Sequence, residues 1–203
     1  MTTTMHTTRY TDDELSRAIT QGPITAEYQA DPQHVIQELN RLRATELASY
    51  LQYKQHAYMA VSLLSPGLKQ DFQAHADVEL QHADRLGERV QQLGGVPIYT
   101  PGELGAKAAE EGVRPAQGAT LDDMVIENLM LERRQIAAYT ALIRELGEAD
   151  LTTRHLLLQI LADTEQHASE LADYLKHTAE TQRKTADASP IVAEQPGPAA
   201  ARA

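Results

Sequence analysis

Four long stretches of the chain carry apolar residues at helical spacing, and hardly any segment alternates as a strand would. The first stretch opens with "DPQHVIQEL", where Asp31 can cap a helix and Pro32 suits its first position. It ends at "LLSPG", where Pro66 and Gly67 break the periodicity. The pattern therefore predicts a helix over residues 32–64.

The second stretch starts at Leu68 and ends in "QQLGGVP", where Gly94 suits a left-handed C-terminal cap and Pro97 forbids continuation. The segment that follows, "VPIYTPGELGAKAAEEGVRPAQGA", contains Pro and Gly and shows little periodicity. It is about as long as needed to run the length of a bundle. We therefore interpret it as a crossover between two pairs of helices.

The third and fourth stretches form another pair. The third opens in "TLDDMVIENLM", where Thr120 and Asp123 have the spacing of a capping box, and Gly147 closes it. The fourth starts near Asp150 after a tight turn and fades near residue 184. Short turns make each pair an antiparallel hairpin, and one long crossover lets the second hairpin dock on the first. The predicted fold is all-α, a four-helix bundle of two hairpins.

The two ends of the chain lack this pattern. Residues 1–31 are polar, Thr-rich and aperiodic, and residues 185–203 are rich in Ala and Pro. We therefore predict a flexible N-terminal tail over 1–31, a bundle domain over 32–184 and a disordered C-terminal tail over 185–203.

Glutamate and tyrosine recur at matched places in the two hairpins. Glu46 and Tyr53 lie seven residues apart in the first helix, and Glu132 and Tyr139 lie seven apart in the third. Seven residues make two helical turns, so each pair shares a face. Taken alone, such glutamates are usually solvated and such tyrosines usually belong to a core. The pairs gain meaning together with the second and fourth helices.

A second repeated motif lies in those helices. The segment "VELQHADRL" places Glu79 three residues before His82, so the two side chains project side by side. The segment "DTEQHASEL" keeps His167 but has Thr164 where the carboxylate would stand. The spacing from the helix glutamate to this motif is nearly equal in both hairpins, so the chain looks like a duplicated hairpin.

These glutamates and histidines have the arrangement of a metal centre. One Glu from each of two helices and Glu-x-x-His from each of the other two form the di-iron pattern of carboxylate bundles. This chain supplies five of those six ligands: Glu46, Glu79, His82, Glu132 and His167. Carboxylates neutralise the cations that they bridge, and imidazole adds affinity for Fe(II). We predict bound iron, with Mn or Zn as alternatives.

Composition restricts the chemistry further. The chain has no cysteine, which excludes disulfides, thiolate metal sites, iron–sulfur clusters and cysteine nucleophiles. The formal net charge of −11 argues against a broad nucleic-acid surface and favours cations as partners. Apolar runs are short, and the N-terminus lacks a signal-peptide pattern. We expect a soluble, cytoplasmic protein without a membrane segment.

Residues from about 33 to 180 resemble the ferritin-like superfamily, particularly the bacterioferritins and the Dps-like group. The resemblance rests on "ATELASYLQYKQHAY", "VELQHADRLGERVQQLGGVP", "LMLERRQIAAYTALIRELGEADLTTR" and "ILADTEQHASEL". It implies iron storage and detoxification by a homo-oligomeric shell of twelve or twenty-four subunits. It also implies ferroxidase activity, in which dioxygen or hydrogen peroxide oxidises Fe(II).

The resemblance also assigns roles to individual residues. It gives one iron to Glu46, Glu79 and His82. It gives the other iron to Glu132 and His167 and makes Glu79 the bridge between the two ions. Tyr53 matches a tyrosine beside the bacterioferritin centre and is the candidate to supply an electron.

Departures from the family pattern change these expectations. Thr164 replaces the second bridging glutamate, so the second iron should be weakly held. Glu165 lies about 100° around the helix, and recruiting it requires local distortion. Leu80 stands where bacterioferritins have a haem-binding methionine, so haem is not expected. No capped fifth helix follows the fourth, which favours twelve subunits over twenty-four.

The tails offer few positive charges for DNA. Arg9 and Arg17 lie near acidic residues in the N-terminal tail, so we expect no tight direct DNA binding despite the Dps-like resemblance.

Alternatives to a ferroxidase stay open at this point. One is a structural cage subunit with impaired or absent oxidation, and another is a Dps-type stress-protection protein. A third is a manganese-containing or rubrerythrin-like peroxide reductase. Rubrerythrins usually carry a cysteine-bound iron, which this chain cannot have.

The remaining histidines have no partner in the repeat, so we interpret them as surface or packing residues: His6, His34, His56, His75, His155 and His177. His75 lies one turn before Glu79 and could border the site, but packing is the favoured interpretation.

Overall fold

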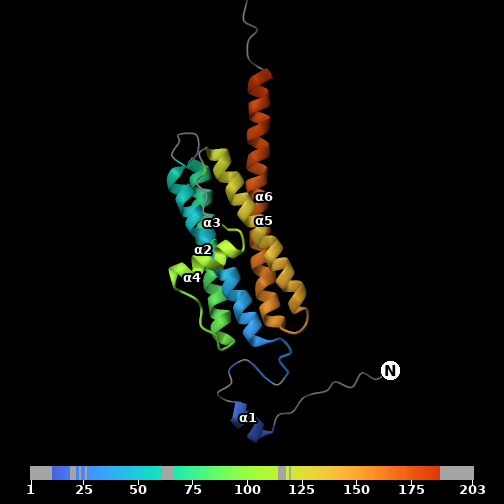
Figure 1. Cartoon of the computed structure of the whole chain (residues 1–203). Helices are drawn as coiled ribbons and strands as arrows, with labels where there is room; N and C mark the ends of the chain where they lie inside the picture. Colours follow the sequence, from blue (N-terminus) through green and yellow to red (C-terminus); the bar gives the residue numbers. More distant parts are fainter. Residues whose placement is uncertain are drawn as a thin grey trace, which may run out of the picture.

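The computed structural model describes residues 11–18, 22, 24–25, 27–60, 66–113, 118 and 120–187. Within them every regular element is an α-helix (Figure 1): α1 (Asp12–Ala18), α2 (Pro32–Met59), α3 (Pro66–Gln92), α4 (Pro101–Glu110), α5 (Leu121–Leu146) and α6 (Leu151–Asp187). The all-α prediction is confirmed, and α2, α3, α5 and α6 are the four predicted long helices. The predicted last turn of the first helix and residues 188–203 lie outside the described residues.

Local capping explains where these helices begin and end. The Asp31 side chain accepts the N–H of Gln33 at 3.0 Å at the start of α2. Thr120 and Asp123 make both hydrogen bonds of a capping box before α5. After α3 the chain turns at Gly94, whose φ of +84° suits glycine. These predicted signals are confirmed.

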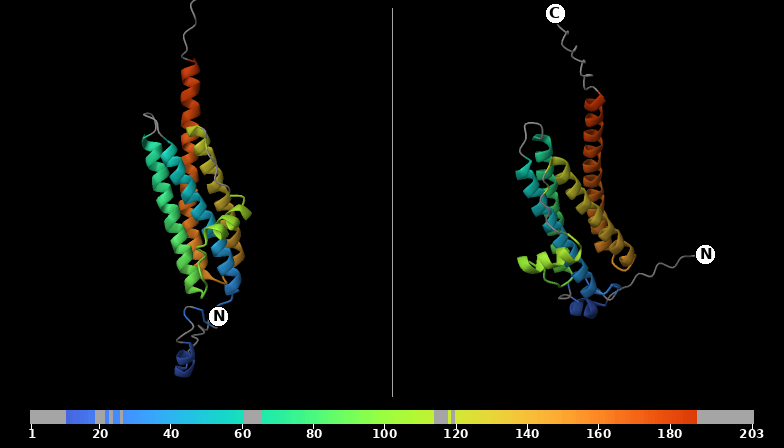
Figure 2. Two further views of the ribbon diagram at one scale, coloured as in Figure 1. Left: turned by 60° about the vertical axis from the view of Figure 1, so that its left-hand side comes forward. Right: turned by 45° about the horizontal axis from the view of Figure 1, so that its top comes forward.

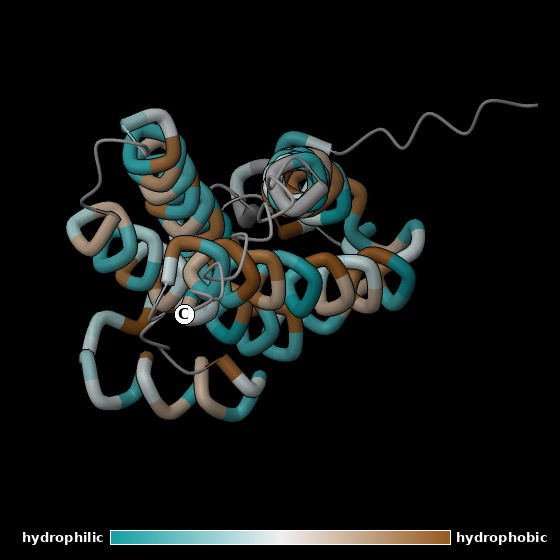
Figure 3. Tube along the Cα trace, turned by 90° about the horizontal axis from the view of Figure 1, so that it is seen from above, coloured by the Kyte–Doolittle hydropathy of each residue, from teal (hydrophilic) through white to brown (hydrophobic). Residues whose placement is uncertain are grey.

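The long helices form two hairpins (Figure 1, Figure 2). Helix α2 packs along α3 and α5 along α6, while contacts of α2 with α5 and of α3 with α6 join the hairpins. Each long helix carries both hydrophobic and hydrophilic positions (Figure 3), as a bundle requires. No helix in the described part of the chain is long and apolar enough to cross a membrane. The end of α6 extends past the other helices (Figure 1).

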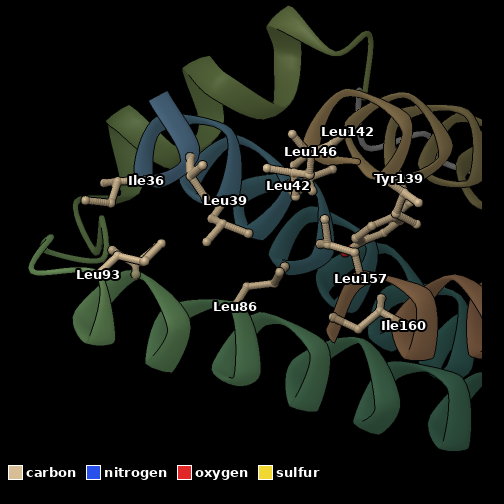
Figure 4. Close-up of a cluster of buried hydrophobic side chains, with 13 residues drawn as sticks. Ile36, Leu39, Leu42, Leu86, Leu93, Tyr139, Leu142, Leu146, Leu157 and Ile160 are labelled. Carbon is tan, nitrogen blue, oxygen red and sulfur yellow. The ribbon is translucent and has the colours of Figure 1, made fainter. Parts of the chain in front are cut away.

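Most of the apolar core forms two layers within the bundle, and a smaller cluster lies between α2 and α4. One layer lies near the start of α2 and includes Leu39, Leu86 and Leu157 (Figure 4). The other lies toward the end of α2 and includes Phe72 and Met124. Full burial of each large apolar side chain contributes roughly 1.5–3 kcal/mol. The helical turns between the two layers carry buried polar side chains instead.

The crossover contains a helix that its sequence pattern did not indicate. Helix α4 begins at Pro101, which suits a first helical position, and packs across α2 through Leu104 and Ala108. Gly102 and Gly105 lower its intrinsic helix propensity. With ten residues and one buried side chain, α4 is too short to produce a visible periodicity. Packing against α2 stabilises it.

Two polar residues of α2 fix the start of the crossover. The amide of Asn40 donates to the carbonyl of Val96 at 3.4 Å and accepts the N–H of Ile98 at 3.0 Å. The buried guanidinium of Arg43 donates to the carbonyls of Ala83 and Ile98. Because these bonds satisfy backbone groups that face the bundle, the connection lies firmly against α2 and α3.

The segment before α2 also contacts the bundle. Ile24 and Tyr28 pack against the apolar layer near the start of α2. The Tyr28 hydroxyl donates to Asp150 at 2.8 Å, and Asp150 forms a buried ion pair with Arg89 at 3.1 Å. The sequence predicts a flexible tail for residues 1–31. It does not predict these contacts, because isolated apolar residues without a helical or strand period give no sign of packing. Residues 1–10 lie outside the described part.

Candidate metal centre

The polar layer between the apolar layers contains the five residues predicted as ligands. Glu46, Glu79 and Glu132 are fully buried, and His82 and His167 are 1% and 6% exposed. Their ligand atoms form two groups, each with all atoms within 4.8 Å of one another. The first ligand group is Glu46, Glu79 and His82, and the second is Glu79, Glu132 and His167. Glu79 belongs to both, which is the position of the predicted bridge.

The first ligand group is built by α2 and α3. His82 Nδ1 lies 3.3 Å from Glu46 Oε2, and His82 Nε2 lies 3.2 Å from Asp163 Oδ2 on α6. A carboxylate on the outer nitrogen orients the ring and fixes its tautomer, which leaves Nδ1 directed at the group. The hydroxyl of Tyr139, from the apolar layer near the start of α2, donates to Glu46 Oε1.

The second ligand group joins α3 to the other hairpin. His167 Nδ1 lies 3.2 Å from Glu79 Oε1 and 3.5 Å from Glu132 Oε1. The Tyr53 hydroxyl donates to Glu132 Oε1 at 2.5 Å. The His75 ring stacks on the His167 ring with 4.0 Å between the centroids. Each half of the centre therefore has one tyrosine that reaches in from an apolar layer and holds a carboxylate.

Thr164 lies in the same layer but turns away from the ligands. It is 1% exposed, and its hydroxyl donates to the carbonyl of Ile160 at 2.9 Å, one turn earlier in α6. Glu165 is exposed, as the rotation of about 100° per residue predicts. Among the described residues, no second carboxylate takes the bridging place opposite Glu79.

Burial changes the protonation of the glutamates. Removal from water raises the pKa of Glu46 and of Glu132 to about 7 and that of Glu79 to about 8, and nearby carboxylates add to the effect. Burial by itself lowers the pKa of His167, but its contacts with Glu132 and Glu79 outweigh this and raise the pKa to about 10. Near neutral pH these glutamates are therefore partly protonated in the metal-free protein.

Buried polar atoms of this layer that lack a hydrogen-bond partner among the described residues include Glu132 Oε2 and Gln135 Oε1. Leaving a buried polar atom unpaired costs roughly 1–3 kcal/mol. Carboxylate oxygen and imidazole nitrogen are ligands that Fe, Mn and Zn accept. The unpaired atoms and the donor set therefore fit divalent cations.

Three further residues contact the ligands without having been predicted to do so. Gln135 Nε2 donates to Glu46 Oε1 at 3.0 Å and to Glu79 Oε2 at 3.2 Å. Tyr139 was expected in the core and His75 in packing, yet both touch the ligand residues. Gln135 and Tyr139 lie one and two turns after Glu132, so their shared face of α5 was the available signal.

The other histidines lie apart from the ligand groups. His56 is buried, with Nδ1 3.0 Å from Asn128 Oδ1. His155 and His177 are exposed, and His6 lies outside the described residues.

A cavity of about 200 Å³ lies between α3 and α6 at the edge of the polar layer. It is lined by Gln81, Arg85, Asp163 and Gln166 together with His82 and His167. Each ligand group therefore contributes one histidine to the wall of this cavity. A small ion in the cavity would lie next to both ligand groups.

Comparisons with known proteins agree with this architecture. The family model for the ferritin-like domain matches residues 36–181. A nutrient stress-induced DNA-binding protein of Synechococcus sp. is 33% identical over 145 residues, 70% of this chain and 80% of that protein. The bacterioferritin of Mycobacterium avium is 31% identical over 156 residues, 77% of this chain and 89% of that protein.

Among solved structures, a dodecameric thioferritin, the bacterioferritin-related protein from Bacteroides fragilis, matches with a TM-score of 0.72 and 25% identity. The match covers 77% of this chain and 92% of that one. The residues matched by the family model include all of α3 and α5, most of α2 and α6, and every predicted ligand. The chain belongs to the ferritin-like family.

Proposed function

We propose that this protein oxidises Fe(II) and stores the ferric product inside a homo-oligomeric shell, which limits iron and peroxide stress. The observation that carries the proposal is the buried pair of ligand groups that share Glu79. Membership of the ferritin-like family, with bacterioferritin and stress-induced relatives, supports iron storage or stress protection as the wider role.

Iron is the substrate of this reaction. Two Fe(II) ions supply two electrons, which with two protons reduce one hydrogen peroxide to two waters or one dioxygen to hydrogen peroxide. The glutamates and histidines bind and orient the ions, and the apolar layers on either side exclude water. Where only one Fe(II) is bound, Tyr53, hydrogen-bonded to Glu132, is the proposed source of the second electron, and its hydroxyl proton can pass to that carboxylate.

The two ions bind unequally in this proposal. Each ligand group has three residues, and the group made by Glu46, Glu79 and His82 is proposed to hold the first cation. The second group shares Glu79 and lacks a carboxylate at Thr164, whose hydroxyl is occupied by the Ile160 carbonyl. The second cation is therefore the weaker one, and it limits the rate of oxidation.

The shell is proposed to contain twelve subunits, because the thioferritin relative is described as dodecameric; twenty-four is the alternative. Multi-angle light scattering should give about 270 kDa, twelve times the chain mass of 22.4 kDa. A mass near twice that value supports the larger shell, and a monomer contradicts the shell altogether.

Direct DNA binding is not part of the proposal. The Synechococcus relative is named for DNA binding, but this chain has a formal net charge of −11. A gel shift at physiological salt should leave plasmid unretarded by low-micromolar protein. Haem is also left out, because Leu80 offers no thioether.

The deciding experiment is an anaerobic Fe(II) titration of metal-free protein by calorimetry, followed by admission of air while ferric absorbance is recorded. We expect two binding events per subunit of unequal affinity and oxidation faster than in buffer. Absence of any binding contradicts the proposal. A parallel Mn(II) titration tests the alternative metal, since iron and manganese share ligand preferences.

A cage subunit with little oxidation of its own is the second candidate. The hydrogen bond from Thr164 to Ile160 favours it, because that hydroxyl is then unavailable to a cation. A single binding event, with Fe(II) oxidised at the rate in buffer, supports this candidate over the ferroxidase.

A further inference from the structure

Gln135 contacts the first ligand group, although the predicted ligand pattern does not include it. Its side chain is 1% exposed, and Nε2 donates to Glu46 Oε1 at 3.0 Å and to Glu79 Oε2 at 3.2 Å. Its Oε1 is buried and has no hydrogen-bond partner in the described part of the chain. One end of the amide is fully used and the other is unpaired.

The metal-free arrangement suits an amide donor. Carboxylate oxygens accept hydrogen bonds, and the two N–H groups of Gln135 satisfy one oxygen of Glu46 and one of Glu79. A cation held by the first ligand group reverses this preference, because the positive ends of the N–H dipoles then face a positive ion. The unpaired amide oxygen is the kind of neutral ligand that such a cation accepts.

We propose that Gln135 turns its amide over when a cation enters the first ligand group and binds that cation through Oε1. The inference rests on the proposed function, which assigns a divalent cation to this group. Rotation about the last side-chain torsion exchanges the two amide ends without moving the backbone. That torsion has broad, roughly two-fold preferences, so the rotation costs little.

The turned amide partly offsets the missing carboxylate of Thr164. It adds an oxygen ligand but no charge, so three glutamates remain the anions that face two divalent cations. It serves the first ion alone, because Gln135 contacts Glu79 Oε2 while Glu79 Oε1 lies beside His167. Gln135 therefore widens the difference in affinity between the two cations.

Ser49 provides a matched control. It follows Glu46 by three residues, as Gln135 follows Glu132, and thus holds the equivalent place in the repeat. Ser49 is fully buried, and its hydroxyl lacks a hydrogen-bond partner among the described residues. Changing it to Ala removes a buried polar atom at the equivalent position without touching the amide.

The first test is calorimetric titration of the metal-free, full-length protein with Zn(II), which cannot change oxidation state. We expect Gln135→Leu to weaken the tighter binding event by about 10- to 100-fold, the range typical for groups that support metal ligands. Gln135→Glu, which keeps an oxygen, and Ser49→Ala should bind at least as tightly as the wild type. Unchanged affinity in Gln135→Leu overturns the inference.

The second test needs no variant and separates ligation from mere support. In crystals of the Zn(II)-loaded wild type, Gln135 Oε1 should lie about 2.0–2.2 Å from the ion. An amide that still donates to Glu46 and Glu79 overturns ligation, even where Gln135→Leu binds weakly. Wild-type protein that binds neither Zn(II), Mn(II) nor Fe(II) overturns the proposed function itself, and the inference with it.

Discussion

The position of the Thr164 hydroxyl decides how the two halves of the centre differ. In α3, Glu79 directs one oxygen toward each ligand group. At the equivalent place in α6, the short side chain of Thr164 reaches only the carbonyl of Ile160 in its own helix. A small change in side-chain length therefore removes both a bridging ligand and a negative charge from the centre.

Replacing Thr164 by Glu should restore the second bridge. We expect the second cation to bind at least about tenfold more tightly, because even groups outside the ligand shell change metal affinity by roughly 10–100-fold. Fe(II) oxidation should become faster. Calorimetry and stopped-flow absorbance measure the two effects. Thr164→Val, which removes only the hydroxyl, is the control and should leave both unchanged.

The two tyrosines make equivalent hydrogen bonds but have different surroundings. Tyr53 lies 5.3 Å from His75 between ring centroids, and His75 Nε2 lies 2.9 Å from Glu170 at the surface. Tyr139 lies in the aliphatic layer near the start of α2 and contacts Glu46. A proton that leaves Tyr53 on oxidation thus has polar groups nearby.

The substitution Tyr53→Phe should therefore slow Fe(II) oxidation severalfold, whereas Tyr139→Phe should change the rate much less. Both variants lose one buried hydrogen bond, so the free energy of unfolding should fall by roughly 0.5–1.5 kcal/mol in each. Stopped-flow rates and urea unfolding separate the two roles. Equal slowing in both variants argues that the tyrosines act only by holding carboxylates.

At the scale of helices, the sequence predicted those features whose cause is local or periodic. Asp31, Thr120 and Gly94 act on the neighbouring backbone, so the sequence alone predicts their caps. The repeated ligand motifs were visible because helical geometry fixes their spacing. Helix α4 and the role of Gln135 were not, since each depends on contacts with residues distant in sequence.

The buried ion pair between Arg89 and Asp150 joins the end of α3 to the start of α6. Asp150→Ala should lower the free energy of unfolding by about 3–5 kcal/mol, because Arg89 is left buried without its partner. Asp77→Ala, which breaks the more exposed pair with Lys54, should cost roughly 0–1 kcal/mol. Urea unfolding at one protein concentration compares them. Equal losses contradict the structural role of Asp150.

At the scale of the whole molecule, the buried acidic layer couples stability to pH. Burial raises the pKa of Glu46, Glu79 and Glu132 from 4.5 to about 7–8, so folding favours their protonated forms. Their contribution is present below pH 4.5 and is lost as the pH rises through 7–8. His167 acts in the same direction, from 6.5 to about 10.

Metal-free protein should therefore unfold at a lower urea concentration at pH 8.5 than at pH 5.5. Its free energy of unfolding should be lower at pH 8.5 by an amount on the order of a few kcal/mol. Zn(II) should remove most of this dependence, since a bound cation stabilises the ionised carboxylates. Glu79→Gln should flatten the dependence in the metal-free protein. A metal-free protein whose stability rises over this range contradicts the assignment of these pKa values.

The shared glutamate has a mechanical consequence for the bundle. The first ligand group belongs entirely to the α2–α3 hairpin, so its cation would brace that hairpin and would reach α5 only through the proposed ligand Gln135. The second group takes Glu79 from that hairpin and Glu132 and His167 from the other, so its proposed cation would act as a removable cross-link between the two hairpins. Because the second ion is proposed to bind more weakly, this cross-link between the hairpins should be lost before the first ion dissociates.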